Sequence, residues 1–439
     1  MTETYNNSTL VKEGYKETKL GLIPKDWTTP TISEVFDFLK TTSFSRNQLS
    51  YDDENKIFYI HYGDIHATFK KPLLDFEIEA NVPKLNDNVT LPNNVQYLKD
   101  GDVIIADASE DYDGVGEAIE IKNLNGKTAI SGLHTFALRD IDNKTVPGFR
   151  TYIFKNPIVK KALKTIATGS KVYGISKSNT QKFKIVLPTL PEQQKIASIL
   201  NTWDKAIAAQ EQLIAQKQAL KKGLMQQLLT GKKRFAGFSG EWKKMRFTEF
   251  SELFHGFQFR KEHFVENGYP VIKIGSLVDS KGLTIDNATY ISEKNAENFE
   301  SFRLYEGDVL MALTGGTLGK VAIVDRDYGK IFQNYRVGKF IPKGNCTKLY
   351  LSQLLQSFYV QQRVKSLVNE AAQPNFGKQD FNKIWIPLPP IEEQKQIASF
   401  LIKFDAEVKL MVSRLDSLKK QKQGLMQQLL TGVKRVYSL

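Results

Sequence analysis

The stretch LPTLPEQQKIASIL, residues Leu187–Leu200, recurs as LPPIEEQKQIASFL at Leu388–Leu401, 201 positions further along the chain. A second pair of stretches keeps the same offset: KKGLMQQLLTGKKR from Lys221 to Arg234, and KQGLMQQLLTGVKR from Lys422 to Arg435. Because no residue is gained or lost between the paired stretches, each copy contains an element of fixed length. The chain is therefore an internal duplication with a rigid element at the end of each copy.

The repeated segments carry the signals of long α-helices. Glu192 and Glu393 place negative charge in the first turn, and Gly231 and Gly432 follow the last apolar residues. Apolar residues recur in alternating steps of three and four, which predicts a coiled-coil seam, although each helix could instead lie on its own globular domain. The predicted seam residues are Ile196, Leu200, Trp203 and Ile207 in the first helix, and Ile397, Leu401, Phe404, Val408, Met411 and Leu415 in the second. Gln210, Lys217, Lys221 and Lys422 depart from the pattern.

The segments that precede the helices correspond more loosely. Trp27 matches Trp242, the strand-like FYIHYGDI at Phe58–Ile65 matches PVIKIGSL at Pro270–Leu277, and LKDGDVIIA at Leu98–Ala106 matches LYEGDVLMA at Leu304–Ala312. The offset between the copies thus falls from 215 through 212 to 206 before it settles at 201. Insertions have therefore accumulated between common strands. A shared scaffold with different loops suits two readers of different targets, and it also fits ordinary drift after duplication.

These patterns predict an α+β protein with two pseudo-repeated α/β domains separated by a long two-helix coiled coil. The helices should be antiparallel, because a two-fold axis that exchanges the repeats makes the second helix run back toward the first domain. The predicted boundaries are an N-terminal tail 1–22, a first domain 23–187, a spacer helix 188–231, a linker 232–240, a second domain 241–387, a spacer helix 388–432 and a C-terminal tail 433–439.

Charge and cysteine content narrow the function classes. The 439-residue chain has a formal net charge of +13, which favours an anionic partner such as nucleic acid over a basic surface without one. Cys346 is the only cysteine, so an intramolecular disulfide and a thiolate zinc cluster are excluded, and we expect the reducing cytoplasm. The sequence shows neither a signal-peptide core nor an apolar run near the ~20 residues that span a bilayer, so we expect no membrane association.

No catalytic motif is present. The chain lacks the Asn/Asp-Pro-Pro-aromatic loop of adenine methyltransferases, and the stretch Gly114–Ile119 lacks the third glycine of a dinucleotide-binding loop. The stretch Thr314–Val321 ends like a phosphate loop but lacks its first glycine and its final Ser or Thr. The five histidines show no metal-ligand spacing. We therefore expect a chain that is not an enzyme and binds neither metal nor cofactor.

Several loops carry side chains suited to DNA, and the alternative for each residue is ordinary surface or turn chemistry. The loop Thr314–Lys320 is rich in Gly and Thr, so its backbone could approach a phosphate. Its counterpart Ser109–Gly116 is acidic, and a carboxylate can accept a hydrogen bond from the amine of cytosine. The candidates are Ser109, Tyr112, Lys171 and Tyr173 in the first half, and Thr314, Thr317, Lys320, Asn334, Tyr335, Arg336, Gln373 and Asn375 in the second.

Several of these stretches together resemble one family. They are IPKDW at Ile23–Trp27, RFAGFSGEW at Arg234–Trp242, GDVLMALTGGTLGKVAIV at Gly307–Val324, LPPIEEQKQIASFL, and GLMQQLLTGVKR at Gly424–Arg435. In this combination the chain resembles the specificity subunit of Type I restriction-modification systems. The resemblance implies that each half begins with a target-recognition domain, and that each domain reads one half of a bipartite double-stranded DNA target. It also implies that the helices set the length of the unread DNA between the two half-sites, here called the unread gap, and recruit the other subunits.

The resemblance also implies partners and cofactors. Two modification subunits would supply methylation with S-adenosylmethionine, and restriction subunits would supply ATP-driven cleavage, with magnesium also on the partner subunits. Because recognition domains of this family differ in their base-reading loops, no base-reading residue and no target sequence can be carried over. The alternative function is a stand-alone DNA-binding protein, regulatory or structural, that bridges two sites without recruiting an enzyme.

Overall fold

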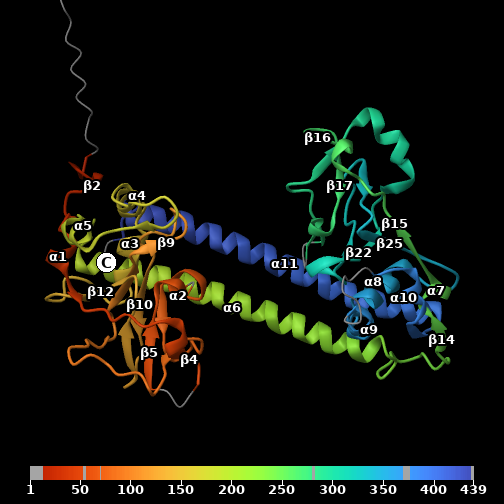
Figure 1. Ribbon diagram of the computed structural model, residues 1–439, viewed down its shortest axis with the longest axis horizontal. Helices are drawn as coiled ribbons and strands as arrows, with labels where there is room; N and C mark the ends of the chain where they lie inside the picture. Colours follow the sequence, from red (N-terminus) through yellow and green to blue (C-terminus); the bar gives the residue numbers. More distant parts are fainter. Residues whose placement is uncertain (1–12, 53–55, 70, 279–281, 369–375, 437–439) are drawn as a thin grey trace, which may run out of the picture. The chain divides into compact units, whose positions relative to one another are not determined.

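The computed structural model describes residues 13–52, 56–69, 71–278, 282–368 and 376–436. The chain forms two compact units (Figure 1). Unit 1 comprises Met1–Ala208 together with Ser417–Leu439, and unit 2 comprises Ala209–Asp416. Unit 1 therefore takes its residues from the start of the first repeat and from the end of the second.

The described part of unit 1 contains a five-stranded and a four-stranded β-sheet, the two-stranded sheets β1-β2 and β13-β9, and several short helices. Its strands are β1 (Tyr15–Thr18), β2 (Gly21–Pro24), β3 (Phe36–Leu39), β4 (Leu49–Ser50), β5 (Ile57–Ile60), β6 (Leu73–Asp75), β7 (Lys84–Leu85), β8 (Val103–Ala106), β9 (Ala108–Ser109), β10 (Ala118–Lys122), β11 (Thr128–Ser131), β12 (Thr135–Asp140) and β13 (Tyr173–Gly174). Its helices before the first spacer are α1 (Ile32–Val35), α2 (Tyr62–Ala67), α3 (Arg150–Lys155), α4 (Pro157–Thr165) and α5 (Lys177–Lys182), with a 3-10 turn η1 (Arg46–Gln48). The sheet orders are β3-β12-β8-β10-β6 and β11-β5-β7-β4.

Unit 2 has a corresponding set of elements. Its strands are β14 (Lys243–Arg246), β15 (Ser251–His255), β16 (Phe264–Val265), β17 (Tyr269–Ile272), β18 (Leu277–Val278), β19 (Gly282–Leu283), β20 (Thr289–Ile291), β21 (Arg303–Leu304), β22 (Val309–Ala312), β23 (Val321–Ile323), β24 (Ile331–Gln333), β25 (Val337–Pro342) and β26 (Trp385–Leu388). Its helices are α7 (Phe247–Phe250), α8 (Lys348–Gln356), α9 (Phe358–Val368) and α10 (Lys378–Asn382), with 3-10 turns η2 (Lys261–His263), η3 (Ile274–Ser276), η4 (Glu293–Phe302) and η5 (Gly315–Thr317). The sheet orders are β15-β25-β22-β23 and β16-β20-β17-β24-β21.

The two units share a common framework of strands. The antiparallel order β3-β12-β8-β10 in unit 1 corresponds to β15-β25-β22-β23 in unit 2. In each unit a second sheet contains one parallel pair, β5 with β11 and β17 with β24. The predicted α+β class, with two pseudo-repeated α/β domains and a long helix after each, is confirmed. The strand predicted over Phe58–Ile65 is correct only as far as Ile60, because the next residues turn into α2.

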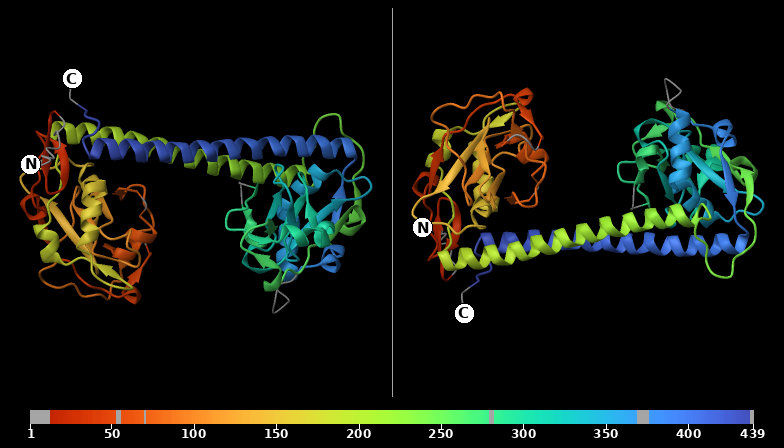
Figure 2. Two further views of the ribbon diagram at one scale, coloured as in Figure 1. Left: turned by 90° about the horizontal axis from the view of Figure 1, so that it is seen from above. Right: turned by 90° about the horizontal axis from the view of Figure 1, so that it is seen from below.

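Two long helices follow the domains. α6 (Leu190–Leu228) and α11 (Ile391–Leu430) contribute residues to both units. In unit 1 the start of α6 lies beside the end of α11, and in unit 2 the end of α6 lies beside the start of α11 (Figure 2). In unit 2, Gln210 contacts Met411 and Lys221 contacts Asp405, so the helices run antiparallel there. None of the helices in the described part of the chain combines the length and apolar character that crossing a membrane requires.

The predicted seam residues lie at different depths. Ile196, Leu200, Ile397, Leu401 and Val408 are buried, whereas Trp203, Ile207, Phe404, Met411 and Leu415 are half-buried. Ile196 and Leu200 join the core of unit 1 together with Leu429 at the end of α11. Ile397 and Leu401 join the core of unit 2 in the same way. Each fully buried Leu or Ile contributes at most roughly 1.5–3 kcal/mol. Each domain is therefore packed against the first turns of its own helix and the last turns of the other.

The four polar residues that interrupt the heptad pattern all have partners on the facing helix. In unit 2, Gln210 Nε2 donates to the carbonyl of Met411 (3.1 Å), and Lys217 lies 4.6 Å from the ring centroid of Phe404. Lys217 and Lys221 also form ion pairs with Glu407 and Asp405, both at 2.5 Å. In unit 1, Lys422 pairs with Asp204 at 2.6 Å. Polar groups at single seam positions fix the register of paired helices, which an apolar seam alone does less well.

Candidate nucleic-acid interface

Each unit contains a buried glutamate in the first turn of its long helix, and this glutamate accepts hydrogen bonds from a tryptophan and an arginine. In unit 1, Glu192 is 4% exposed and accepts hydrogen bonds from Trp27 Nε1 (2.7 Å) and from Arg435 Nε (2.8 Å) and Nη2 (2.9 Å). Arg435 also pairs with Asp26 at 2.6 Å. In this arrangement the second repeat supplies the arginine and the first repeat supplies the glutamate.

Unit 2 repeats this cluster with the roles of the two repeats exchanged. Glu393 is fully buried and accepts from Trp242 Nε1 (2.9 Å) and from Arg234 Nε (2.8 Å) and Nη2 (2.7 Å). Planar bidentate pairing of this kind fixes orientation as well as charge. Glu192 and Glu393 therefore do more than complement a helix dipole, because each joins a helix start to a tryptophan and to the chain that follows the other helix.

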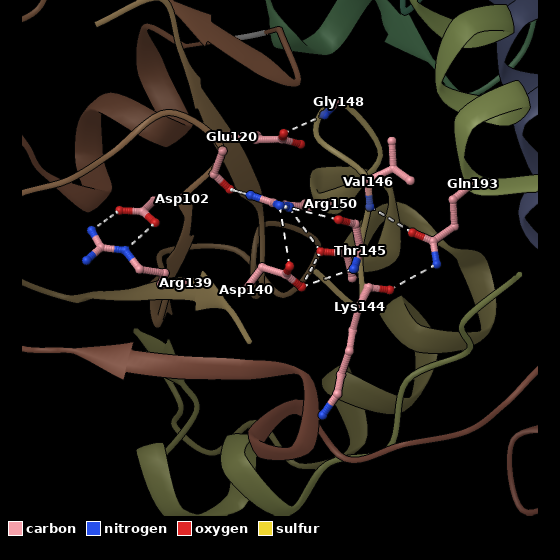
Figure 3. A network of polar contacts seen from close by, with 11 residues as sticks. Asp102, Glu120, Arg139, Asp140, Lys144, Thr145, Val146, Gly148, Arg150 and Gln193 are labelled. Atoms are coloured by element: carbon pink, nitrogen blue, oxygen red, sulfur yellow. Dashed lines mark hydrogen bonds and ion pairs between the residues drawn. The ribbon is translucent and has the colours of Figure 1, made fainter. Parts of the chain in front are cut away.

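A second polar network joins the sheet of unit 1 to α6 (Figure 3). Arg139 forms a bidentate pair with Asp102, at 3.0 and 2.7 Å. Glu120, which is 2% exposed, accepts a hydrogen bond from the backbone amide of Gly148 (2.5 Å). Burial raises the pKa of Glu120 to about 7, although hydrogen bonds and the charge of Arg150 oppose this rise.

The loop Lys144–Gly148 links this network to the helix (Figure 3). Gln193 of α6 accepts from the amide of Val146 (3.0 Å) and donates to the carbonyl of Lys144 (3.3 Å). Gln394 makes the equivalent contacts in unit 2, where it accepts from the amide of Thr347 and donates to the carbonyl of Asn345. The helix start thus holds one loop of its own domain in each unit.

Lysines of α3 and α4 pair with acidic side chains within and directly after the acidic loop predicted in unit 1. Lys164 pairs with Asp113, and both Lys155 and Lys160 pair with Glu117. The hydrogen bond and charge of Lys164 lower the pKa of Asp113. Burial works against ionisation of Glu117, but the lysines outweigh it and the pKa of Glu117 is lowered. The loop is therefore less repulsive to a phosphate backbone than its sequence suggests.

Three of the four candidates in unit 1 meet at the strand pair β9–β13. Tyr173 lies opposite Ser109, and the rings of Tyr112 and Tyr173 make an edge-on contact with centroids 5.3 Å apart. Tyr112 donates to the carbonyl of Lys164 (2.8 Å) and keeps an exposed face, whereas Ser109 is buried. Lys171 is exposed in the loop before β13. The tyrosines and Lys171 thus offer surface to a ligand, and Ser109 serves the turn.

The Gly/Thr loop of unit 2 borders a cleft of about 430 Å³ that Gln356, Gln361 and Lys365 also line. Thr314 and Thr317 are half-buried, and their hydroxyls have no hydrogen-bond partner in the described protein. Lys320 lines the same cleft. Gln361 holds the loop in place, because its Nε2 donates to the carbonyl of Gly319 (2.7 Å).

The remaining candidates of unit 2 follow β24. Asn334 is buried and its Oδ1 accepts from the amide of Arg336 (3.2 Å), so this oxygen serves the turn. Tyr335 and Arg336 reach the surface together, with Arg336 Nε donating to the Tyr335 hydroxyl (2.8 Å). Gln373 and Asn375 lie outside the described residues. Within the described ranges, no three His, Cys, Asp or Glu side chains gather closely enough to hold a metal ion.

Comparison with known families gives a match in both halves of the chain. The model of the Type I restriction modification DNA specificity domain matches residues 24–217 and again 239–420. The chain belongs to this family. Each DNA specificity domain, so matched, combines one α/β domain with most of the long helix that follows it.

Relatives and solved structures agree with this assignment. The MjaVIII specificity subunit of a Type I restriction enzyme from Methanocaldococcus jannaschii is 26% identical, with 98% of this chain and 97% of that protein covered. The EcoKI specificity subunit of Escherichia coli is 23% identical, with 86% and 82% covered. The crystal structure of a Type I S subunit from M. genitalium has a similar fold, with 15% identity, a TM-score of 0.55, and 92% of this chain and 96% of that chain covered.

One surface of the first DNA specificity domain was missed by the sequence patterns. A cleft of about 580 Å³ is lined by the chain after β3, by Asp107, and by Leu133 and His134 between β11 and β12. His134 lies between Leu133 and Thr135, so neither of its immediate neighbours is aromatic or basic. The one available signal is its positive φ of 54°, which only the structure reveals.

Proposed function

We propose that this chain is the DNA-sequence-specificity subunit of a Type I restriction-modification complex, in which each specificity domain reads one half of a bipartite target. The observation that carries the proposal is the double match to a DNA specificity domain. Two further observations support it: the units share a framework of strands but differ in the loops at β9–β13 and η5, and the net charge of +13 favours a phosphate backbone. The family match favours this function over a stand-alone regulatory or structural DNA-binding protein.

The chain acts through partners and is not itself an enzyme. Two modification subunits add the methyl group from S-adenosylmethionine, and restriction subunits use ATP and magnesium. The absence of a methyltransferase loop from the sequence supports this division of labour. The protein works in the cytoplasm, where its DNA and its partners are found.

Mapping DNA methylation in cells that carry and lack this chain tests the proposal. We expect one bipartite sequence to be methylated only when the chain is present, and the purified chain with S-adenosylmethionine alone to methylate nothing. Identical methylation maps, or methyl transfer by the purified chain, would refute it.

A domain exchange tests independent reading by the two domains. Replacing residues 28–173 with the matching region of another such protein should change one half of the methylated sequence and leave the other. A chimera that folds but changes both halves would contradict the assignment of one half-site to each domain.

A further inference from the structure

The turn between β11 and β12 in unit 1 is the structural counterpart of the turn between β24 and β25 in unit 2. Each turn follows a strand of the parallel pair and leads into the central antiparallel sheet. Three backbone hydrogen bonds match one for one. They are Thr42 N to Ser131 O, Gly132 N to Ile60 O and Asp107 N to His134 O in unit 1, and Phe257 N to Gln333 O, Asn334 N to Ile272 O and Leu313 N to Arg336 O in unit 2. His134 therefore occupies the place of Arg336.

The turn in unit 1 is held rigidly. The hydroxyl of the fully buried Tyr59 accepts from the amides of Leu133 (2.9 Å) and Phe44 (3.0 Å) and donates to the carbonyl of Thr42 (3.1 Å). A side chain at Gly132 would come within 2.6 Å of the same hydroxyl. The backbone of the turn is thus fixed, while the side chain of His134 is 51% exposed.

His134 faces one carboxylate and a cleft lined by both polar and apolar side chains. Its Nδ1 lies 3.3 Å from Asp107 Oδ1, and its ring makes an edge-on contact with Tyr62, with centroids 5.3 Å apart. Burial raises the pKa of Asp107, and the contact with His134 opposes this rise. The cleft is also lined by Lys40 and Asn94, so hydrogen-bonding groups meet there from several separate loops.

We infer that His134 reads a base in the DNA half-site of the first specificity domain by accepting a hydrogen bond from an exocyclic amine. In neutral histidine a proton on Nδ1, held toward Asp107, leaves Nε2 as the acceptor. Major-groove amines that an acceptor can recognise are N6 of adenine and N4 of cytosine. This inference rests on the proposed function, and it names a specificity-determining residue within it.

The equivalence of the turns explains how one framework serves two targets. In unit 2 the same position carries Arg336, a donor-only side chain that suits the O6 and N7 acceptors of guanine. In unit 1 the equivalent turn, which has the same backbone hydrogen bonds, presents a hydrogen-bond acceptor, Nε2 of His134. The chemistry at this position is therefore reversed between the domains without any change of scaffold.

The test is selection of randomised DNA duplexes on the purified full-length chain, followed by sequencing. His134→Gly suits the positive φ of this position and removes only the side chain. Asp142→Gly makes the same change at another exposed turn residue, with φ 56°, and serves as the matched control. Circular dichroism should show that all variants fold like the wild type.

We expect His134→Gly to weaken the preference for adenine or cytosine about tenfold at one position of one half-site, with the other half unchanged. The base that loses preference tells which of the two amines is read. His134→Arg should move the preference at that position to guanine, and Arg336→Gly should relax one position in the other half. Asp142→Gly should select the wild-type sequence.

An unchanged sequence with folded His134→Gly would overturn the inference about His134, and so would a loss spread evenly over both halves. A wild-type chain that selects no bipartite sequence would overturn the proposed function and this inference with it. A wild-type chain that selects one, while His134→Gly selects the same one, would leave the proposed function standing and remove only the role of His134.

Discussion

Replacing Glu120 with glutamine should remove a large part of the pH dependence of unit 1 stability. Burial raises the pKa of Glu120 from 4.5 to about 7 in the folded protein. The folded state therefore binds a proton that the unfolded state releases between these two values. The sign follows directly: this group favours folding below pH 4.5, and the contribution is lost as the pH rises to about 7.

The size of the effect follows from the shift. One pKa unit corresponds to about 1.4 kcal/mol, so the free energy of unfolding should fall by about 3 kcal/mol across this window because of Glu120 alone. Glutamine stays neutral throughout and can still accept from the amide of Gly148. Glu120→Gln should therefore flatten the profile between pH 4.5 and about pH 7.

The measurement is urea denaturation at several pH values, with β10 followed by hydrogen-exchange mass spectrometry and corrected for intrinsic exchange rates. Glu117→Gln is the matched control on the neighbouring segment. Because lysines lower the pKa of Glu117, its contribution is present near neutral pH and lost in acid, so the control should change the profile with the opposite sign. A Glu120→Gln profile parallel to that of the wild type would refute the reasoning.

Three further predictions concern the helices. Arg435→Met leaves the buried Glu192 without its charged partner and should lower the free energy of unfolding of unit 1 by about 2 kcal/mol, as measured by urea denaturation. A free energy of unfolding equal to that of the wild type within experimental error would contradict this prediction. A fragment of residues 1–231 should form a homodimer through its helix and read a palindromic split site, because Lys221 can then pair with Asp204 of the other copy. A strictly monomeric fragment in sedimentation experiments would count against this prediction. Inserting one matched heptad near Gln210 and Met411 lengthens each helix by about 10 Å and should widen the unread gap by up to about three base pairs. Methylation at the original spacing would show that the helices do not set the length of the gap.

The duplication and the long helices could be predicted because both leave local patterns in the sequence. A constant offset and a three-four spacing are readable without any tertiary information. The interruptions at Gln210 and Lys221 looked like weaknesses of the seam, yet each has a partner on the facing helix. Such partners depend on the antiparallel register, which a single helix sequence does not contain.

The candidate site was harder to predict, because its residues gain meaning only from the fold. The sequence placed Tyr112 and Tyr173 in separate loops, and only strand pairing brings their rings together. His134 lies in the short stretch Gly132–Thr135, which has no reader-like composition, and shifting offsets hid its equivalence to Arg336. Likewise, α2 replaced a predicted strand because the side chain of His61 caps its first turn.

The sharing of each unit between the two repeats has a consequence for biosynthesis. Unit 2 is continuous in sequence, so it can fold as soon as Asp416 has left the ribosome. Unit 1 includes Leu429 and Arg435, so its core stays open until these residues have been translated. The domain that is translated first is therefore completed last, and its unsealed apolar surface has to be shielded from aggregation during synthesis of the remaining chain.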